Sequence, residues 1–229
     1  MRIVIRIGGS IVASPINPDL IKRYVALLEN LKEQGHSIAV VVGGGTLARE
    51  YIKTAKDLGL TQSDQDNVAI SVSRLFALLF LKKLGKLSCD SVSTTVENAA
   101  NCLKNGKIAV MGGLRPGMTT DAVAALIAER VGADLYIKAT DQEGIYDKDP
   151  RTHSDAVKLD RLCFEDLSHT LAEKKHKAGI HQILDPEAVK VLRKGTVKVV
   201  VVNGARPENV SAAVCGKKVG TIIEKSPKK

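Results

Sequence analysis

The sequence contains no tryptophan and few other aromatic residues, and its cysteines and histidines form no metal-binding pattern. Only four of 229 residues are Tyr and three are Phe, too few for the stacking platforms that bind single-stranded nucleic acids. No CxxC pair and no HExxH or HxH spacing occurs, which argues against a zinc site or a metalloprotease. Cys89, Cys102, Cys163 and Cys215 are far apart along the chain, and in a reducing cytosol we expect four free thiols.

Long apolar runs are also absent. No stretch approaches the roughly 20 apolar residues of a membrane span, and the N-terminus enters a strand pattern without the apolar core of a signal peptide. We therefore expect a cytoplasmic protein that contacts no membrane. The 34 basic and 25 acidic side chains give a formal net charge of +9. The basic residues form no stripe, so nucleic acid is not expected as a partner, although the field would attract small phosphorylated anions.

Strand and helix patterns alternate along the chain. Asn17 and Pro18 predict the start of a helix that Gly35 ends, and Thr94 with Glu97 predicts a capping box for another. Runs of branched apolar residues predict buried strands at 2–7, 37–42, 107–111, 134–140, 196–202 and 219–224. Uninterrupted apolar strands separated by helices indicate a largely parallel sheet that is covered on both faces. The chain therefore reads as one α/β domain, with two lobes meeting over a cleft.

Glycine-rich turns follow three of these predicted strands. They are Gly8–Ser10, Gly43–Thr46, and Gly112–Gly113 with the segment 116–120 behind it. Ligands of open α/β sheets bind beyond the carboxyl ends of the strands. Glycine lets backbone N–H groups approach an anion, and a following helix adds its N-terminal dipole. Three such turns indicate a ligand with several phosphates.

Missing motifs exclude or weaken some classes of phosphate-binding site. No GxxxxGK[ST] sequence occurs, which excludes a Walker-type P-loop. Gly43-x-Gly45-x-x-Ala48 fits the loose dinucleotide fingerprint, so an NAD-type oxidoreductase stays an alternative. That fingerprint expects an acid at the end of the next strand, whereas Asp64 and Asp66 begin a helical stretch.

Charged residues near the strand ends suit phosphoryl transfer, which needs positioning and charge neutralisation. Arg6 ends the first strand, Lys138 is on the strand 134–140, and Arg49 follows the second glycine turn. Asp121 begins a helix, where it could cap the helix or orient a catalytic cation or Mg²⁺. We predict Arg6, Asp121 and Lys138 as the catalytic residues. The run 140–150 is rich in acids and turn-forming residues, and predicts a strand end, a tight turn and a short hairpin.

These residues carry a resemblance that covers nearly the whole chain. Four pieces of the chain resemble the amino-acid-kinase superfamily, and within it the archaeal type of uridylate kinase: RIGGS at 6–10, VVVGGGTLAREYIKTAKDLG at 40–59, VMGGLRPGMTTDAVAALIAE at 110–129 and ATDQEGIYDKDPRTHSDAVKLDRL at 139–162. The most specific piece is PG-x-TTDAVAA at 116–125. The resemblance implies a three-layer αβα sandwich with a mainly parallel sheet, spanning 1–229. Its N-terminal lobe would bind the acceptor and its C-terminal lobe ATP.

The resemblance also implies an activity and a set of binding residues. It implies transfer of the γ-phosphate of ATP to UMP in pyrimidine nucleotide biosynthesis, with Mg²⁺ accompanying ATP and with a homohexamer as the assembly. The implied ATP-binding residues are Gly9, Ser10, Gly45, Arg49, Thr140, Asp141, Tyr146 and Asp149. The implied UMP-binding residues are Gly44, Asp66, Leu114, Arg115, Pro116, Gly117, Met118, Thr119 and Thr120. Which residues would bind Mg²⁺ is not implied.

Two further functions stay open from the sequence. Another small-molecule phosphate kinase of the same superfamily, such as one acting on a phosphorylated isoprenoid, would need an apolar pocket beside 114–120. Arg115 and the two threonines in this loop suit a nucleotide better. A nucleotide-binding sensor or storage protein without turnover is the third possibility. Its only hint is Arg6, which stands where bacterial relatives have lysine.

Overall fold

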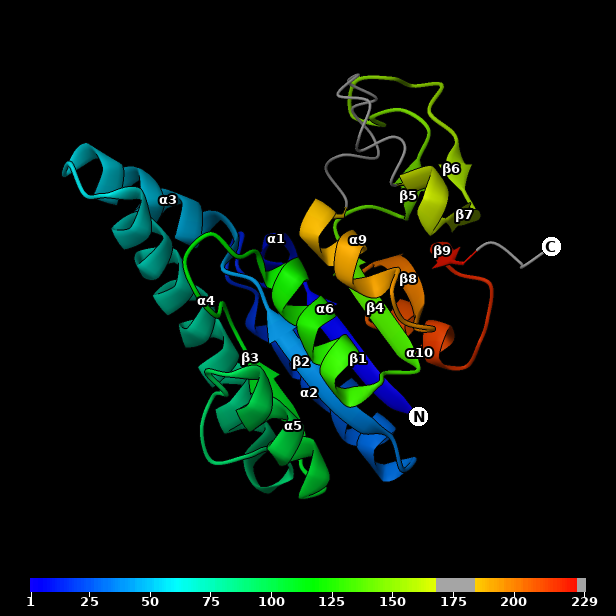
Figure 1. The fold of residues 1–229 in the computed structure, drawn as a ribbon, viewed down its shortest axis with the longest axis horizontal. Coiled ribbons are helices and arrows are strands. Elements are labelled where there is room, and N and C mark those ends of the chain that lie inside the picture. The colour runs from blue at the N-terminus through cyan, green and yellow to red at the C-terminus, as the bar shows by residue number, and fades with distance from the viewer. Residues whose placement is uncertain (168–183, 226–229) are drawn as a thin grey trace.

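A seven-stranded sheet forms the centre of the molecule in a computed structural model that describes residues 1–167 and 184–225 (Figure 1). All neighbouring strands are parallel except β8 and β9, which run antiparallel. In sheet order the strands are β3 (Ala109–Met111), β2 (Ser37–Val42), β1 (Arg2–Ile7), β4 (Leu135–Thr140), β8 (Lys198–Asn203), β9 (Thr221–Glu224) and β7 (Arg161–Cys163). The mainly parallel sheet confirms the predicted fold class.

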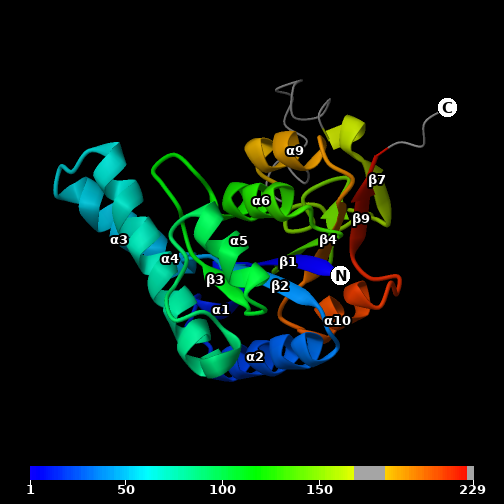
Figure 2. The same cartoon turned by 60° about the horizontal axis from the view of Figure 1, so that its bottom comes forward.

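Helices cover both faces of this sheet, as Figure 2 shows with α2 on one side and α5 and α6 on the other. One buried cluster joins the sheet to α1 (Gly9–Val12), α2 (Pro18–Glu33), α4 (Gln62–Leu84) and α10 (Glu208–Val214). The other joins it to α5 (Val96–Lys104), α6 (Thr120–Val131) and α9 (Pro186–Leu192). The helical pair α3 (Gly45–Asp57) and α4 extends beyond the sheet in both views. None of the helices described here is long and apolar enough to cross a membrane.

Side-chain caps fix the starts of the helices that matter for the site. Asn17 Oδ1 accepts from Leu20 N at 2.9 Å, and Thr119 Oγ1 accepts from Ala122 N at 3.1 Å. The predicted capping box at Thr94 is wrong by one residue, because Thr95 is the N-cap of α5 and its hydroxyl accepts from Asn98 N at 3.0 Å. The threonine with extended backbone geometry directly before the first helical turn is the one that can cap it.

The predicted strands are all present. Among the short elements without a predicted counterpart are β7, α10 and the four-residue α1. The hairpin predicted within 140–150 is different in the structure, since β5 (Ile145–Tyr146) pairs antiparallel with β6 (Lys158–Leu159). A short 3₁₀ turn, η1 (Gly85–Leu87), follows α4.

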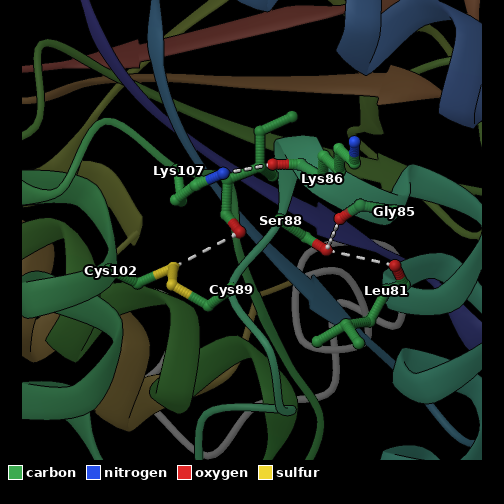
Figure 3. The surroundings of a disulfide bond; sticks show 8 residues. Leu81, Gly85, Lys86, Ser88, Cys89, Cys102 and Lys107 are labelled. Carbon is green, nitrogen blue, oxygen red and sulfur yellow. Dashed lines mark hydrogen bonds between the residues drawn. A yellow bond between two sulfur atoms is a disulfide. The ribbon is translucent and has the colours of Figure 1, made fainter.

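The expectation of four free thiols is wrong, because Cys89 and Cys102 form a disulfide (Figure 3). Cys89 lies in the loop after η1, and Cys102, 13 residues later, lies in α5. Both segments pack near β3, which brings the two Cα atoms to 6.0 Å. Next to it, Ser88 Oγ is within hydrogen-bond distance of the carbonyl oxygens of Leu81 and Gly85. Cys163 and Cys215 are free thiols.

Reduction of this disulfide is expected to lower the free energy of unfolding by about 3 kcal/mol, the value for a closed loop of about this length. Urea denaturation with and without dithiothreitol measures the difference. The variant Cys89→Ala/Cys102→Ala is the control, and its unfolding midpoint should not respond to the reductant. Identical midpoints for the oxidised and reduced wild-type chain would contradict the prediction.

Candidate active site

The register of the central strands places two cations side by side. Arg6 on β1 is the direct neighbour of Lys138 on β4, and both lie near the carboxyl ends of their strands. Because side chains alternate along a strand, Arg6 and Lys138 share the face of Val4 and Tyr136, which pack in the cluster under α6. The parallel pairing therefore brings two positive charges to one point beneath the start of α6.

Asp121, in the first turn of α6, lies between these two cations. Its Oδ2 accepts from Lys138 Nζ at 2.5 Å, and its Oδ1 lies 2.9 Å from Arg6 Nε. The second contact is an ion pair without good hydrogen-bond geometry, since neither atom has a hydrogen-bond partner in the described structure. The side chains of Arg6, Asp121 and Lys138 are only 17%, 11% and 5% exposed. This triad is a buried cluster with one excess positive charge.

Burial and charge act in opposite directions on the acid and the base of the triad. Burial raises the pKa of Asp121, but Arg6 and Lys138 outweigh it and the net shift is downward, so the carboxylate is ionised. Burial lowers the pKa of Lys138, and although Asp121 raises it, the net shift is also downward. The lysine is thus held closer to deprotonation than an exposed one.

The first two glycine turns touch each other directly. A Cβ on Gly9 would lie 2.0 Å from Gly45 N, and a Cβ on Gly43 would lie 2.7 Å from Gly9 N. Gly45 also has a φ of +62°, which side chains rarely adopt. The turns after β1 and β2 therefore form one continuous stretch of backbone. The guanidinium of Arg6 reaches this stretch, since its Nη1 would be 3.1 Å from a Cβ on Gly8.

The third glycine turn meets the second across a pocket of about 430 Å³. Gly44 and Gly113 both line it, and both pack against Ser73 of α4. The three turns thus lie at one end of the sheet, as the sequence predicts. The remaining lining residues come from α3, α4, the loop before α6 and the first residue of α6: Ala48, Arg49, Ile52, Asp66, Ala69, Ile70, Ser73, Arg115, Gly117, Met118, Thr119 and Thr120.

Most of the residues expected to bind UMP line this pocket. Leu114 and Pro116, which the resemblance also implied, belong to the same loop but are not among the lining residues. Asp66 holds the loop, since its Oδ2 accepts from Gly117 N at 2.7 Å. Thr120 Oγ1 accepts from Arg6 Nη2 at 3.1 Å, so the pocket borders the buried triad.

Arg49 was expected beside the ATP phosphates, and the structure places it in the wall of this pocket. Its Nη2 donates to Thr46 Oγ1 at 3.1 Å, which keeps the guanidinium next to the second glycine turn. From this position the side chain adjoins both Gly45 and the pocket. It is therefore suited to contact an anion that lies between them.

Four of the other expected ATP-binding residues lie at the end of β4 and in the segment that follows it. Gly8 N donates to Ala139 O at 2.9 Å, which ties the first glycine turn to the end of β4. The buried Thr140 ends β4, and Asp141, Tyr146 and Asp149 follow in and around β5. Asp141 lies 3.9 Å from Arg151, and Asp149 Oδ1 accepts from Arg151 N at 3.0 Å. Ser10 lies in α1, directly after the first turn.

Of the α4 residues that line the pocket, sequence reasoning named only Asp66. Asp66, Ile70 and Ser73 are spaced four and three residues apart, so they share one face of the helix. A buried serine within an apolar helical run was the available signal. Asp185 was not named as a site residue: it caps α9 by accepting from Glu187 N at 2.8 Å, and its other oxygen accepts from the Thr119 hydroxyl.

The arrangement can bind two anionic groups at once and stabilise charge between them. Backbone turns, Arg6 and Lys138 converge on one place, with a pocket on one side and the β4–β5 segment on the other. Such preorganised donors and cations are what phosphoryl transfer requires. The described residues contain no group of three metal-ligating side chains, and both oxygens of Asp121 already face cations.

Comparison with known proteins gives consistent matches over nearly the whole chain. The sequence model of the Amino acid kinase family matches residues 1–203. The uridylate kinase of Methanocaldococcus jannaschii is 40% identical over 228 residues, which are 98% of this chain and 100% of the relative. That of Haloquadratum walsbyi is 39% identical over 97% of this chain and 93% of its own length.

Solved structures agree with these matches. The crystal structure of uridylate kinase from Archaeoglobus fulgidus superposes with a TM-score of 0.87 at 36% identity, covering 97% of this chain and 100% of the other. The UMP kinase from Bacillus anthracis gives a TM-score of 0.82 at 19% identity over 99% and 96%. At that identity the second match supports the fold alone.

Proposed function

The chain belongs to the amino acid kinase family, and we propose that it is a uridylate kinase, which transfers the γ-phosphoryl group of ATP to UMP and forms UDP and ADP. One observation carries the proposal. Arg6 contacts Thr120 of the pocket and lies beside Gly8 of the first glycine turn, so a single cation borders both binding regions. The full-length matches to uridylate kinases support the choice of UMP as the acceptor.

In the proposed reaction, an oxygen of the UMP phosphate attacks the γ-phosphorus and the bond to the bridging oxygen of ADP breaks. The pocket holds UMP, with Gly44, Asp66 and the loop 114–120 around it. Arg6 and Lys138 stabilise the charge that spreads over the transferred group. Asp121 contacts no substrate in this scheme. It fixes the two cations and opposes the lowering of the Lys138 pKa by burial.

In this proposal the adenosine of ATP lies beyond the triad, while the ATP phosphates reach the edge of the acceptor pocket. The phosphates lie on Gly9, Ser10, Gly45 and Arg49, and the adenosine lies along Thr140, Asp141, Tyr146 and Asp149. The acceptor thus belongs to an N-terminal lobe and ATP to a C-terminal lobe, with the triad between them. Mg²⁺ accompanies the ATP phosphates and water, a binding mode that needs no protein cage. Asp121 is an unsuitable ligand, because its oxygens already face Arg6 and Lys138.

We further propose that the protein acts in pyrimidine nucleotide biosynthesis in the cytoplasm and assembles into a homohexamer. The surface of α4 supports self-association. Leu75, Leu78 and Leu79 are 55%, 37% and 44% exposed on the side of α4 that faces away from the core. An apolar stripe of this kind is typical of a helix that is covered by a partner. Light scattering at a series of protein concentrations tests the assembly.

The proposed activity is tested with ATP and a panel of acceptors. The panel contains UMP, CMP, AMP and isopentenyl phosphate, and the products are separated by ion-exchange chromatography. We expect UDP from UMP at the highest kcat/KM. Phosphorylation of isopentenyl phosphate alone would favour the related small-molecule kinase, and binding of UMP and ATP without turnover would favour a nucleotide sensor.

Asp66→Ala is expected to raise the KM for UMP by about tenfold, while the KM for ATP changes less than twofold. The carboxylate both faces the pocket and holds Gly117 N at 2.7 Å, so its removal affects only the acceptor side. Loss of such a charge-assisted hydrogen bond corresponds to roughly this factor. Steady-state kinetics with each substrate varied in turn gives both constants.

Asp64→Ala is the matched control for this variant. Asp64 belongs to the same first turns of α4, but its carboxylate accepts from the Thr61 hydroxyl at 2.6 Å and does not line the pocket. Its KM values should stay at those of the wild type. Equal increases of both KM values in Asp66→Ala would refute the assignment of Asp66 to the acceptor.

A further inference from the structure

Side chains of helix α4 hydrogen-bond to the backbone at the start of the loop that lines the acceptor pocket. Arg74 Nε donates to Gly113 O at 2.9 Å, and Arg74 Nη2 donates to Leu114 O at 3.0 Å. From the preceding residue, Ser73 Oγ accepts from Gly113 N at 2.7 Å and donates to Ile70 O at 2.8 Å. Two successive residues of α4 thus satisfy three backbone groups at the start of the loop.

The loop and the helix also approach so closely that no side chain fits between them. A Cβ on Gly112 would lie 2.6 Å from Arg74 N, and one on Gly113 would lie 2.9 Å from Ile70 Cγ1. The path of the chain directly after β3 is therefore set by the surface of α4. Arg74 is half-buried and does not line the pocket itself.

Beyond this start the loop is held at only a few points. Residues 115–117 are exposed, and a Cβ on Gly117 would meet nothing within 4 Å. The next side chains that fix it are Asp66, which accepts from Gly117 N, and Thr119, which caps α6. Arg115, which lines the pocket, lies directly after the residues that Arg74 fixes. Any movement at the start of the loop would therefore displace the pocket wall.

We propose that Arg74 is a positioning residue for the phosphoryl acceptor: its fork on the carbonyls of Gly113 and Leu114 keeps the acceptor loop in the shape that binds UMP. The inference rests on the proposed function for the identity of the acceptor. A planar guanidinium suits the task, because two donors with fixed spacing can meet two successive carbonyl oxygens. Lysine offers a single point charge and cannot reproduce both contacts.

The positioning role of Arg74 can be tested apart from the transfer step, because Arg74 and the triad have different polar partners. Arg6, Asp121 and Lys138 are held by one another and by Thr120, whereas the guanidinium of Arg74 donates to the carbonyls of Gly113 and Leu114. Loosening the loop should therefore weaken the acceptor complex while the transfer step at saturating UMP stays close to normal. ATP, whose adenosine lies beyond the triad, should bind as before.

The test compares Arg74→Met and Arg74→Lys with the wild-type chain. For Arg74→Met we expect the KM for UMP to rise about tenfold, with kcat and the KM for ATP within twofold of the wild-type values. For Arg74→Lys we expect an intermediate KM for UMP, since one of the two contacts can be kept. Calorimetric titration with UMP alone should show the same order of affinities, independently of turnover.

Arg130→Met is the matched control. Arg130 also uses Nε and Nη2 in a fork, here on the Glu97 carboxylate at 2.8 Å, but it lies at the far end of α6. Its KM for UMP should not change. Urea denaturation checks that each variant is folded. If Arg74→Met does not fold, Arg74→Lys is compared with the wild type instead.

The outcomes separate this inference from the proposed function. An unchanged KM for UMP in the folded Arg74 variants, or equal increases of both KM values, would overturn the positioning role. Failure of the wild-type chain to form UDP from UMP would instead refute the proposed function. In that case calorimetry still decides whether Arg74 affects binding of UMP.

Discussion

Lys138→Met is expected to lower kcat by about 10²- to 10³-fold, the loss observed when one preorganised donor to a transition state is removed. In the proposed function Lys138 is one of two cations beside the transferred phosphoryl group, and only 5% of its side chain is exposed. Methionine has nearly the same length and apolar stem, so the space stays filled. The remaining Arg6 and Asp121 form a neutral pair. The fold should therefore lose little stability while turnover collapses.

Steady-state kinetics and urea denaturation of the same preparation measure the two effects. Lys198→Met is the control, since Lys198 lies on the neighbouring strand β8 but at its amino end, away from the glycine turns. Its kcat should equal that of the wild type. A kcat of Lys138→Met within threefold of the wild-type value would remove Lys138 from the catalytic residues.

The pH dependence of kcat gives the Lys138 prediction a second readout. Burial lowers the pKa of this lysine below its ordinary value of 10.5, despite the opposing effect of Asp121. As pH rises through that lowered pKa, the ammonium loses its proton and the cation beside the phosphoryl group disappears. We therefore expect the alkaline limb of kcat to lie below pH 10.5 in the wild type and to be absent from the residual activity of Lys138→Met.

The triad shows how far sequence reasoning can reach. Arg6, Asp121 and Lys138 were predicted as catalytic because a strand end, a helix start and a second strand carry them. Their pairing depends on the order β1–β4, which brings together strands more than a hundred residues apart. No local pattern specifies that order. The sequence thus predicts the participants, and only the sheet topology shows that one carboxylate serves both cations.

The same limit applies to the pocket and to the disulfide: the sequence indicates some of their residues but not the distant contacts between them. Gly44, Asp66 and the loop before α6 were named from motifs, and they line one pocket. Ser73 and Arg74 carry no motif, because their contacts are with backbone atoms of residues about 40 positions away. Cys89 and Cys102 likewise meet only because α5 returns to the edge strand β3. Contacts between side chain and distant backbone leave almost no signal in a single sequence.

Asp121→Asn is expected to lower the free energy of unfolding by about 3–5 kcal/mol at pH 7, the cost of leaving buried charge without its partner. Removing the carboxylate leaves Arg6 and Lys138 as neighbouring cations in a site that is largely closed to water. Turnover should fall as well, since their mutual repulsion displaces both from the phosphoryl group. Urea denaturation and steady-state kinetics measure the two losses.

The stability difference should depend on pH with a definite sign. The pKa of Asp121 lies below its ordinary value of 3.8, because Arg6 and Lys138 outweigh the opposing effect of burial. A carboxyl whose folded-state pKa is depressed contributes its full stabilisation above the unfolded pKa and loses it as pH falls through the folded value. The wild type and Asp121→Asn should therefore differ most near neutrality and converge in acid below pH 3.8. A difference that grows on acidification would contradict this account.

A double variant that combines Asp121→Asn with Lys138→Met distinguishes a loss of stability caused by unpaired charge from one caused by altered packing. If Asp121→Asn destabilises the fold through two unpaired cations, then adding Lys138→Met removes one of them and should restore part of the lost stability. The double variant should thus be more stable than Asp121→Asn alone, a coupling between contacting groups that a double-mutant cycle detects. Losses that simply add would mean that Asp121 acts through packing or through the N-terminus of α6, and that the triad is not held together by charge.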